Sequence, residues 1–278
     1  FADTILEKAA DDDTIWVHDY QLMLVPQMVR EKRPNISIGF FLHIPFPSFE
    51  IFRTLPWRTE ILTGLLGVDL IGFHTYDYER HFLSSVRRLL GLEVSFNDIY
   101  LDNRVIKVDS FPMGIDYKKF SEAAKEHSQR DETQKSELQK RLDTHKKSAP
   151  DAKFFLSIDR LDYSKGIAKR LNAYEYFLNK YPEYKEKVRL IILAVPSRSN
   201  VPQYKLLKKE IDELVGRING ELSTVSWTPI WYFYRSMPFE NLIDLYTTCD
   251  IAWLTPIRDG MNLVAKEYIA TRTDKTGV

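Results

Sequence analysis

Residues 154–166 read FFLSIDRLDYSKG, an apolar run that passes directly into a polar turn. An amphipathic stretch from Ile167 to Asn179 follows, and a second apolar run extends from Val188 to Val195. Runs that are apolar on both faces are typical of buried parallel strands, and the stretch between them has helical spacing. The order strand, helix, strand is the signature of a βαβ unit, so this segment predicts a parallel α/β sheet.

The same alternation continues on both sides of this unit. Upstream, it predicts strands at 14–18, 37–43 and 70–74 and helices at 26–33, 57–66 and 77–90. Downstream, it predicts helices at 204–218, 239–247 and 262–271 and strands at 224–228 and 251–254. Because crossovers between parallel strands are right-handed, we expect two doubly wound, Rossmann-like α/β domains.

Residues 118–150 differ in composition from both flanks. Lys, Glu, Gln, Ser and Asp dominate this segment, which predicts a solvated helix and a linker. The expected organisation is therefore a domain at 1–117, a charged helix and linker at 118–150 and a second domain at 151–278. Phe1 is not a start residue, and the chain stops at Val278 where a new element is beginning, so we expect both domains to be truncated.

The bulk composition excludes several classes of protein. Lys plus Arg and Asp plus Glu both number 39, so no broad basic field indicates a nucleic-acid or membrane partner. No apolar run approaches the roughly 20 residues that a membrane helix requires. Cys249 is the single cysteine and cannot form an internal disulfide, which fits a cytoplasmic location.

Ligands of open α/β sheets bind beyond the carboxyl ends of the strands, so polar residues there are the candidates. Four strand ends carry them: Asp19, His43, the segment 160–166, and the segment 258–262. Asp19 could act as a general base or cap the next helix. His43 could donate a hydrogen bond to a sugar oxygen or be structural.

Arg160 and Lys165 stand five residues apart in a turn that opens a helix. Two cations near a helix N-terminus favour a diphosphate, because backbone N–H groups and the helix dipole add to their charge. The alternative is a surface ion pair of either cation with Asp159 or Asp162.

Asp259 precedes Gly260 between a strand and a helix, where the missing Cβ allows close approach of a ligand. Asp259 can accept hydrogen bonds from sugar hydroxyls, and Glu267 on the following helix can reach a ribose diol. The free N–H groups at the helix start, those of Asn262, Leu263 and Val264, can meet a phosphate. The alternative is that Asp259 caps the helix and Glu267 is solvated.

The sequence contains neither G-x-G-x-x-G after a strand nor a P-loop, and its histidines have no metal-ligand spacing. We therefore expect no dinucleotide cofactor and no metal. A diphosphate held by cations needs neither, because positive charge offsets the charge that develops on the leaving group.

Four segments in order resemble the motifs of the trehalose-6-phosphate synthase family: 18–20 (HDY), 42–47 (LHIPFP), 160–166 (RLDYSKG) and 258–268 (RDGMNLVAKEY). The resemblance covers nearly the whole chain. It implies a retaining glycosyltransferase of the two-domain GT-B type. Members of this family move glucose from UDP-glucose to glucose 6-phosphate without a metal.

The resemblance also implies roles for individual residues. On the donor side, Arg160 and Lys165 would hold the UDP diphosphate and Glu267 the uridine ribose. Asp259 would hold the donor glucose, together with the backbone at Met261, Asn262 and Leu263.

On the acceptor side, Asp19 would lie at the acceptor sugar, and Arg198 would meet the acceptor phosphate. His43 would hydrogen-bond the transferred glucose, so the resemblance predicts a catalytic set of His43, Arg160, Lys165 and Asp259. No protein nucleophile is required if the leaving phosphate takes the acceptor proton.

The family's N-terminal segment, with a Gly-rich loop over the donor phosphates, and its C-terminal segment have no counterpart in these residues. We therefore expect weak or no turnover if these residues are the whole molecule. Two other interpretations stay open: another phosphorylated acceptor such as glycerol 3-phosphate, and a non-catalytic subunit of a trehalose-synthesising complex. A homo-oligomer is also compatible with the sequence.

Overall fold

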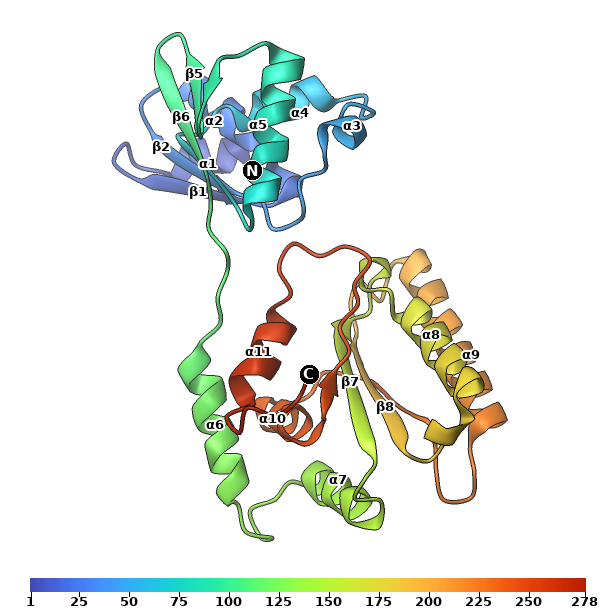
Figure 1. Cartoon of the computed structure of the whole chain (residues 1–278). Coiled ribbons are helices and arrows are strands. Elements are labelled where there is room, and N and C mark those ends of the chain that lie inside the picture. Colours follow the sequence, from blue (N-terminus) through green and yellow to red (C-terminus); the bar gives the residue numbers. More distant parts are fainter. The chain divides into compact units, whose positions relative to one another are not determined.

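A computed structural model describes residues 1–278 and divides them into two compact units, Phe1–Met113 and Gly114–Val278. Each unit contains its own sheet with helices packed against it (Figure 1). The boundary therefore falls after Met113, whereas the sequence placed it after residue 117. Two α/β units are the architecture that the alternation of strands and helices predicted.

The first unit is built on a six-stranded sheet in the order β1-β2-β3-β6-β5-β4. Its strands are β1 (Thr14–His18), β2 (Ser37–Phe41), β3 (Leu70–Phe73), β4 (Val94–Ser95), β5 (Asp98–Leu101) and β6 (Arg104–Ser110). Its helices are α1 (Ala2–Lys8), η1 (Tyr20–Leu22), α2 (Val25–Lys32), α3 (Phe49–Phe52), α4 (Arg58–Leu65) and α5 (Tyr76–Leu90). The first four strands of the order are parallel, and β4, β5 and β6 form an antiparallel meander that the sequence analysis did not predict.

Helices cover one face of the first sheet. The parallel strands β1, β2, β3 and β6 advance in one direction, and right-handed crossovers then place every connecting helix on the same side. Val17, Phe40 and Ile71 are buried under these helices in one continuous core. Trp16 alternates with Val17 on β1, points to the other face and is 67% exposed. The first unit is therefore not doubly wound, in contrast to the expectation from sequence.

The second unit is built on a parallel sheet in the order β10-β7-β8-β9. Its strands are β7 (Lys153–Arg160), β8 (Val188–Val195), β9 (Ile230–Tyr234) and β10 (Ile251–Ala252). Its helices are α6 (Tyr117–Gln129), α7 (Glu137–Ser148), η2 (Tyr163–Lys165), α8 (Ile167–Lys180), η3 (Pro182–Tyr184), α9 (Pro202–Leu222), α10 (Phe239–Thr248) and α11 (Leu263–Thr271).

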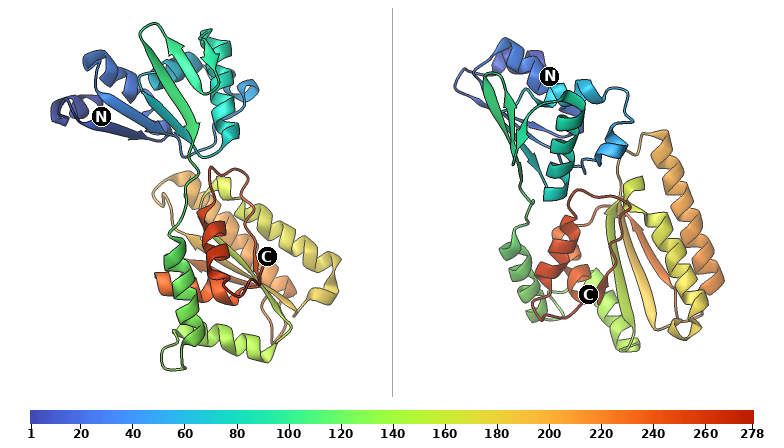
Figure 2. Two further views of the ribbon diagram at one scale, coloured as in Figure 1. Left: turned by 60° about the vertical axis from the view of Figure 1, so that its left-hand side comes forward. Right: turned by 45° about the horizontal axis from the view of Figure 1, so that its top comes forward.

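This second sheet is doubly wound. Helices α8 and α9 lie on one face and α10 and α11 on the other (Figures 1 and 2). The chain runs outward from β7 through β8 to β9 and then returns past β7 to form β10. The direction of winding therefore reverses between β7 and β10. In open α/β sheets this switch point, at the carboxyl ends of the strands, is where ligands bind.

Two predicted segments differ from the structure. The strand expected at 224–228 is a turn, in which Trp227 is buried and its indole N–H donates to the Val188 carbonyl at 2.9 Å. The strand itself is β9, six residues later. The segment 118–150, expected to be a solvated helix and a linker, forms two helices, α6 and α7, whose Ala124 and Leu142 are buried. Both helices pack against α10, which explains why few apolar residues suffice to hold them.

Candidate active site

The loops after β7 and β10 meet at the switch point of the second sheet. The Lys165 ammonium lies 2.5 Å from a carboxylate oxygen of Asp259, and Asn262 donates to the same oxygen at 3.4 Å. The backbone N–H groups of Ile257 and Arg258 donate to the Ser164 carbonyl at 2.8 and 3.2 Å. Residues that the sequence placed at two separate strand ends therefore form one cluster.

Gly166 allows the two loops to approach. It adopts a left-handed conformation with φ of 66°, which favours glycine. A Cβ at this position would come within 3.2 Å of both the Ile257 side chain and the Thr255 carbonyl oxygen. The chain direction and the close packing at this turn both require glycine.

Arg160 ends β7 and is exposed, and its guanidinium group makes no hydrogen bond or ion pair. The alternative in which Arg160 or Lys165 pairs with Asp159 or Asp162 is wrong. Asp159 pairs with Arg170 at 2.8 Å, and Asp162 accepts hydrogen bonds from the Ser164 backbone and hydroxyl. The turn after β7 therefore carries the unpaired guanidinium group of Arg160 and the ammonium group of Lys165, whose partner is Asp259.

Arg170 is the main structural residue that the sequence analysis missed. Its side chain is fully buried and donates to Ser157 and Asp159 on β7, to the Lys165 carbonyl at 3.2 Å and to the Thr255 hydroxyl at 3.1 Å. Burial raises the pKa of Asp159, and the Arg170 charge and hydrogen bond oppose that rise. One side chain thus fixes the strand and both loops. A cation one turn into an amphipathic helix, three to four residues from its apolar neighbours, was the available signal.

The start of α11 is capped by Asn262 and not by Asp259. The Asn262 side-chain oxygen accepts a hydrogen bond from the Ala265 N–H at 2.9 Å, as N-cap residues do. Met261 and Leu263 flank the cap and are partly exposed. The capping alternative for Asp259 is therefore wrong, and its carboxylate faces Lys165.

Glu267 lies on α11 and is partly buried. The Tyr246 hydroxyl donates to one of its carboxylate oxygens at 2.5 Å. Burial, and then the Glu267 carboxylate, raises the pKa of Tyr246 far above its usual range. Glu267 is thus held in place by a neutral phenol, in contrast to the solvated alternative, and its second oxygen has no hydrogen bond to the protein.

Arg198 follows β8 and joins the same end of the sheet. Its guanidinium group donates to the Tyr204 hydroxyl at 2.5 Å, and that hydroxyl donates to Asp162 at 2.9 Å. Burial would raise the pKa of Asp162, but hydrogen bonds from Ser164 and Tyr204, with the Arg198 charge, hold it below its usual range. Arg198 has φ of 48°, a left-handed conformation that non-glycine residues rarely adopt.

In the first unit, His43 and Asp19 lie beyond neighbouring strands. The His18 Nδ1 and His43 Nε2 atoms are 3.0 Å apart, and their rings stack. Both histidines line a pocket of about 410 Å³ on the helix-free face of the sheet. Burial and the nearby His43 lower the pKa of His18. His43 therefore has a neutral imidazole beside it.

Asp19 has φ of 68°, and its carboxylate accepts a hydrogen bond from the Tyr20 N–H at 3.0 Å. It caps η1, which is one of the two roles that the sequence left open. A non-glycine residue in this backbone region is strained, and such strain concentrates at functional sites.

The 278 residues contain no group of three or more His, Cys, Asp or Glu side chains arranged to hold a metal ion. None of the helices combines the length and apolar character that a membrane crossing needs.

The cationic and carboxylate groups therefore lie at the switch point of a doubly wound sheet, which is where α/β proteins of this class bind their ligands. Residues 1–278 match the sequence profile of Glycosyltransferase family 20, and the chain belongs to this family. It is 49% identical over its whole length to a UDP-forming alpha,alpha-trehalose-phosphate synthase of Dictyostelium discoideum. It is 47% identical to the 56 kDa subunit of the corresponding synthase of Saccharomyces cerevisiae. The chain spans 37% and 55% of the length of these two relatives.

Solved structures agree with this assignment. A UDP-forming synthase from Burkholderia xenovorans superposes over the whole chain with a TM-score of 0.88 at 35% identity. An E. coli protein bound with UDP-2-fluoro glucose gives a TM-score of 0.87 at 35% identity. In both cases the chain covers 60% of the solved chain. The two-domain GT-B fold expected from the sequence is confirmed.

Proposed function

We propose that the protein containing these residues transfers glucose from UDP-glucose to glucose 6-phosphate with retention, giving trehalose 6-phosphate and UDP. The observation that carries the proposal is the cluster at the switch point. There, the unpaired Arg160 lies on the strand whose loop brings Lys165 to Asp259. The family assignment supports the sugar and the nucleotide, because relatives across this family are named UDP-forming trehalose-phosphate synthases.

On the donor side, Arg160 and Lys165 bind the diphosphate. A guanidinium group can bind two phosphate oxygens at once, whereas the ammonium acts as a point charge. The incoming diphosphate competes with Asp259 for Lys165, and the Asp259 carboxylate accepts hydrogen bonds from the glucose hydroxyls. Glu267 has one oxygen occupied by Tyr246 and uses the other for the uridine ribose.

The backbone at Met261, Asn262 and Leu263 completes the sugar side of the donor site. The Asn262 side chain already satisfies the Ala265 N–H, so the N–H groups earlier in the first turn remain available for a ligand oxygen.

On the acceptor side, we assign Asp19 to the acceptor sugar, Arg198 to the acceptor phosphate and His43 to the transferred glucose. Two of these residues, Asp19 and Arg198, have positive φ values, which supports a functional constraint on them. A retained anomeric configuration follows when the acceptor hydroxyl attacks the face that the phosphate leaves. The C1–phosphate bond breaks, the new C1–oxygen bond forms, and the leaving phosphate oxygen takes the hydroxyl proton.

The cations act on the leaving group in this scheme. Negative charge accumulates on the β-phosphate as the bond to C1 breaks, and fixed positive charge stabilises it more in the transition state than in the ground state. We infer no metal and no organic cofactor for this step. UDP-glucose and glucose 6-phosphate are substrates.

A second candidate is a non-catalytic subunit. The chain also superposes on the N-terminal domain of a trehalose-6-phosphate phosphatase from Candida albicans, with a TM-score of 0.83 at 34% identity. The fold therefore does not by itself distinguish a synthase from a domain of another protein. The retained charges Arg160, Lys165, Asp259 and Glu267 favour the synthase.

The proposal is tested by incubating the protein with UDP-glucose and glucose 6-phosphate and measuring both UDP and trehalose 6-phosphate. The expected result is equimolar formation of both products. Glycerol 3-phosphate as acceptor serves as the comparison and should give no UDP. UDP release with glycerol 3-phosphate alone would assign a different acceptor, and no release with either acceptor would refute the proposal.

A cytoplasmic location and assembly into a homo-oligomer or a trehalose-synthesising complex remain part of the proposal. The yeast relative described as a 56 kDa subunit supports an assembly.

A further inference from the structure

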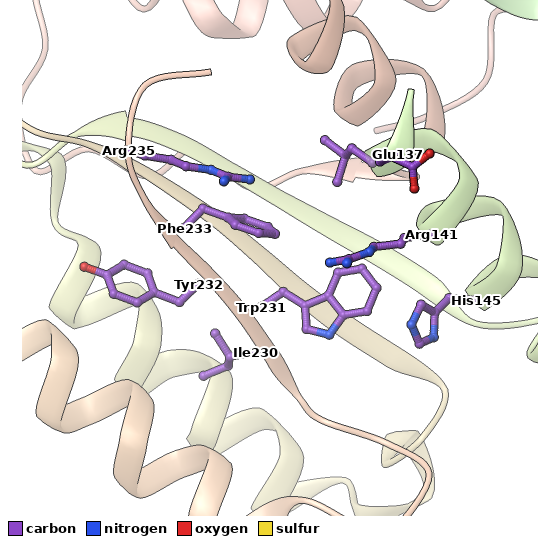
Figure 3. A pocket seen from close by; sticks show the side chains of 9 residues that line it. Glu137, Arg141, His145, Ile230, Trp231, Tyr232, Phe233 and Arg235 are labelled. Carbon is purple, nitrogen blue, oxygen red and sulfur yellow. The ribbon is translucent and has the colours of Figure 1, made fainter. Parts of the chain in front are cut away.

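The second unit contains a pocket of about 750 Å³ that shares no lining residue with the proposed donor site. It lies between α7 and the edge strand β9 (Figure 3). Helix α7 supplies Arg141 and His145, which are four residues apart and share one face of the helix. Strand β9 supplies Trp231 and Phe233, which alternate to the same face of the sheet, and Arg235 follows the strand. A volume of this size suits a small molecule.

The charge of this pocket is positive. Arg141 and Arg235 are exposed, and neither has a carboxylate partner. In Figure 3 their side chains extend toward each other from opposite sides of the pocket, above Phe233 and Trp231. Glu137 is the only carboxylate among the lining residues, and it pairs with Lys140 at 3.1 Å. Two converging guanidinium groups, neither of which pairs with an acid, provide the geometry that binds a phosphate monoester.

A third cation contacts one of the residues that line the pocket. The Arg189 guanidinium stacks 4.3 Å from the centre of the Trp231 ring and is 6% exposed. Its Nε donates to the Thr228 carbonyl at 3.0 Å, and it has no carboxylate partner. A buried, uncompensated cation is unfavourable by itself and adds to the positive potential of the pocket.

The floor of the pocket is aromatic. Trp231 and Phe233 are both partly exposed, and the His145 ring meets Trp231 edge-on at 4.6 Å. Burial, and then the Arg189 charge, lowers the pKa of His145, so its imidazole is neutral near pH 7. Flat aromatic surfaces of this kind stack on the ring of a ligand and tolerate different rings.

We propose that the pocket between α7 and β9 is a second ligand site, which binds a phosphate monoester attached to a flat ring, as in a nucleoside monophosphate. Arg141 and Arg235 bind the phosphate, and Trp231 and Phe233 stack on the ring. The site is independent of the donor site, because the two share no residue. It therefore binds its ligand while UDP is bound.

The test is a calorimetric titration of AMP into the protein in the presence of saturating UDP. AMP stands for the ligand class, and adenosine and inorganic phosphate separate the contributions of ring and phosphate. We expect one AMP per chain, and at least a tenfold weaker affinity for either of the other two probes. The double variant Arg141→Gln/Arg235→Gln should lose at least tenfold in AMP affinity and keep its affinity for UDP.

Arg160→Gln is the matched control, because it removes one arginine from the donor site. It should show the opposite pattern, with weaker UDP binding and unchanged AMP binding. No AMP binding to the wild-type protein, or equal AMP affinity in the double variant, would overturn the proposal. A failure of UDP to bind would count against the donor site and leave the AMP measurement in place, since AMP can then be titrated alone.

Discussion

Arg170 provides a stringent test of how the donor site is held together. Its side chain is fully buried, as is its partner Asp159, whose side chain is 3% exposed. Arg170→Met keeps an apolar stem of similar length and removes the guanidinium group. Breaking a buried pair by removing one partner costs about 3–5 kcal/mol, because the remaining charge is buried without compensation. We expect the free energy of unfolding of the second unit to fall by this amount.

The loss can be separated from general damage by two further variants. In Asp159→Asn/Arg170→Met no charge remains buried, so most of the stability should return. Arg217→Met removes an exposed arginine that pairs with Glu175 on the surface, and should cost less than about 1 kcal/mol. Guanidinium chloride denaturation, followed by hydrogen exchange of the β7 and α8 amides, measures the second unit by itself.

The stability loss in Arg170→Met depends on pH with a defined sign. Burial raises the pKa of Asp159 above its usual range. Without Arg170 that rise is larger, so the folded variant binds a proton more readily than the unfolded chain does. The penalty in Arg170→Met is therefore present at neutral pH and is relieved as the pH falls toward and below the raised pKa.

The same variant should weaken UDP binding, although Arg170 is a positioning residue. It loses hydrogen bonds to the Lys165 carbonyl and to Thr255, each worth about 1 kcal/mol. A combined loss of about 2 kcal/mol corresponds to roughly thirtyfold in affinity. The rescued double variant should keep this defect while regaining stability. Equal stability of Arg170→Met and Arg217→Met, or full recovery of UDP affinity in the double variant, would refute the reasoning.

Three other outcomes are expected. Asp259→Asn removes the carboxylate partner of Lys165, so calorimetry should show that UDP binds roughly threefold more tightly. The preference for UDP-glucose over UDP should disappear in this variant. Weaker UDP binding would count against the assigned roles. Gly166→Ala should lower the unfolding free energy by about 1–2 kcal/mol and weaken UDP binding. Gly91→Ala is the control, because Gly91 also has a positive φ, of 67°, but no atom lies within 4 Å of the new Cβ. The control should affect stability alone. Because burial and the neighbouring His43 lower the pKa of His18, the stability of the first unit should fall as the pH drops below about 6.5, and a pH scan of His18→Gln should be flatter.

The alternation of apolar runs and amphipathic stretches was sufficient to predict most of the fold. Strands 14–18 and 188–195 begin and end where the sequence placed them. The helix-period signal also located α5, α8 and α10 to within one or two residues. These elements were predictable because burial imposes a period that is visible in the sequence itself.

The segments that differ from the prediction depend on contacts that no local pattern reveals. Trp227 belongs to a turn, and it is buried because its indole finds a carbonyl on another strand. Helices α6 and α7 contain few apolar residues and are stable because they pack on α10. In these segments tertiary packing determines the structure, because local propensity and composition do not.

For the candidate site, strand-end reasoning selected candidate residues but could not give their partners. Lys165 was expected to pair, if at all, with a neighbour in sequence, whereas its partner is Asp259, on the loop that follows another strand. The switch point explains the difference, since β7 and β10 are adjacent in the sheet although their first residues, Lys153 and Ile251, are 98 positions apart in the sequence. Arg170 has a signal in the sequence, its place among apolar neighbours in the first turns of an amphipathic helix, but its partners Asp159 and Thr255 are recognisable only in the structure.

Calorimetric titration with UDP tests the central assignment most directly. Arg160→Gln and Lys165→Gln should each weaken UDP binding by roughly tenfold to a hundredfold, the loss of one charge-assisted hydrogen bond to phosphate. Lys169→Gln, an exposed lysine without a partner four residues after Lys165, should bind UDP as the wild-type protein does. UDP affinities in Arg160→Gln and Lys165→Gln that equal those of wild type and Lys169→Gln would contradict the assigned diphosphate site.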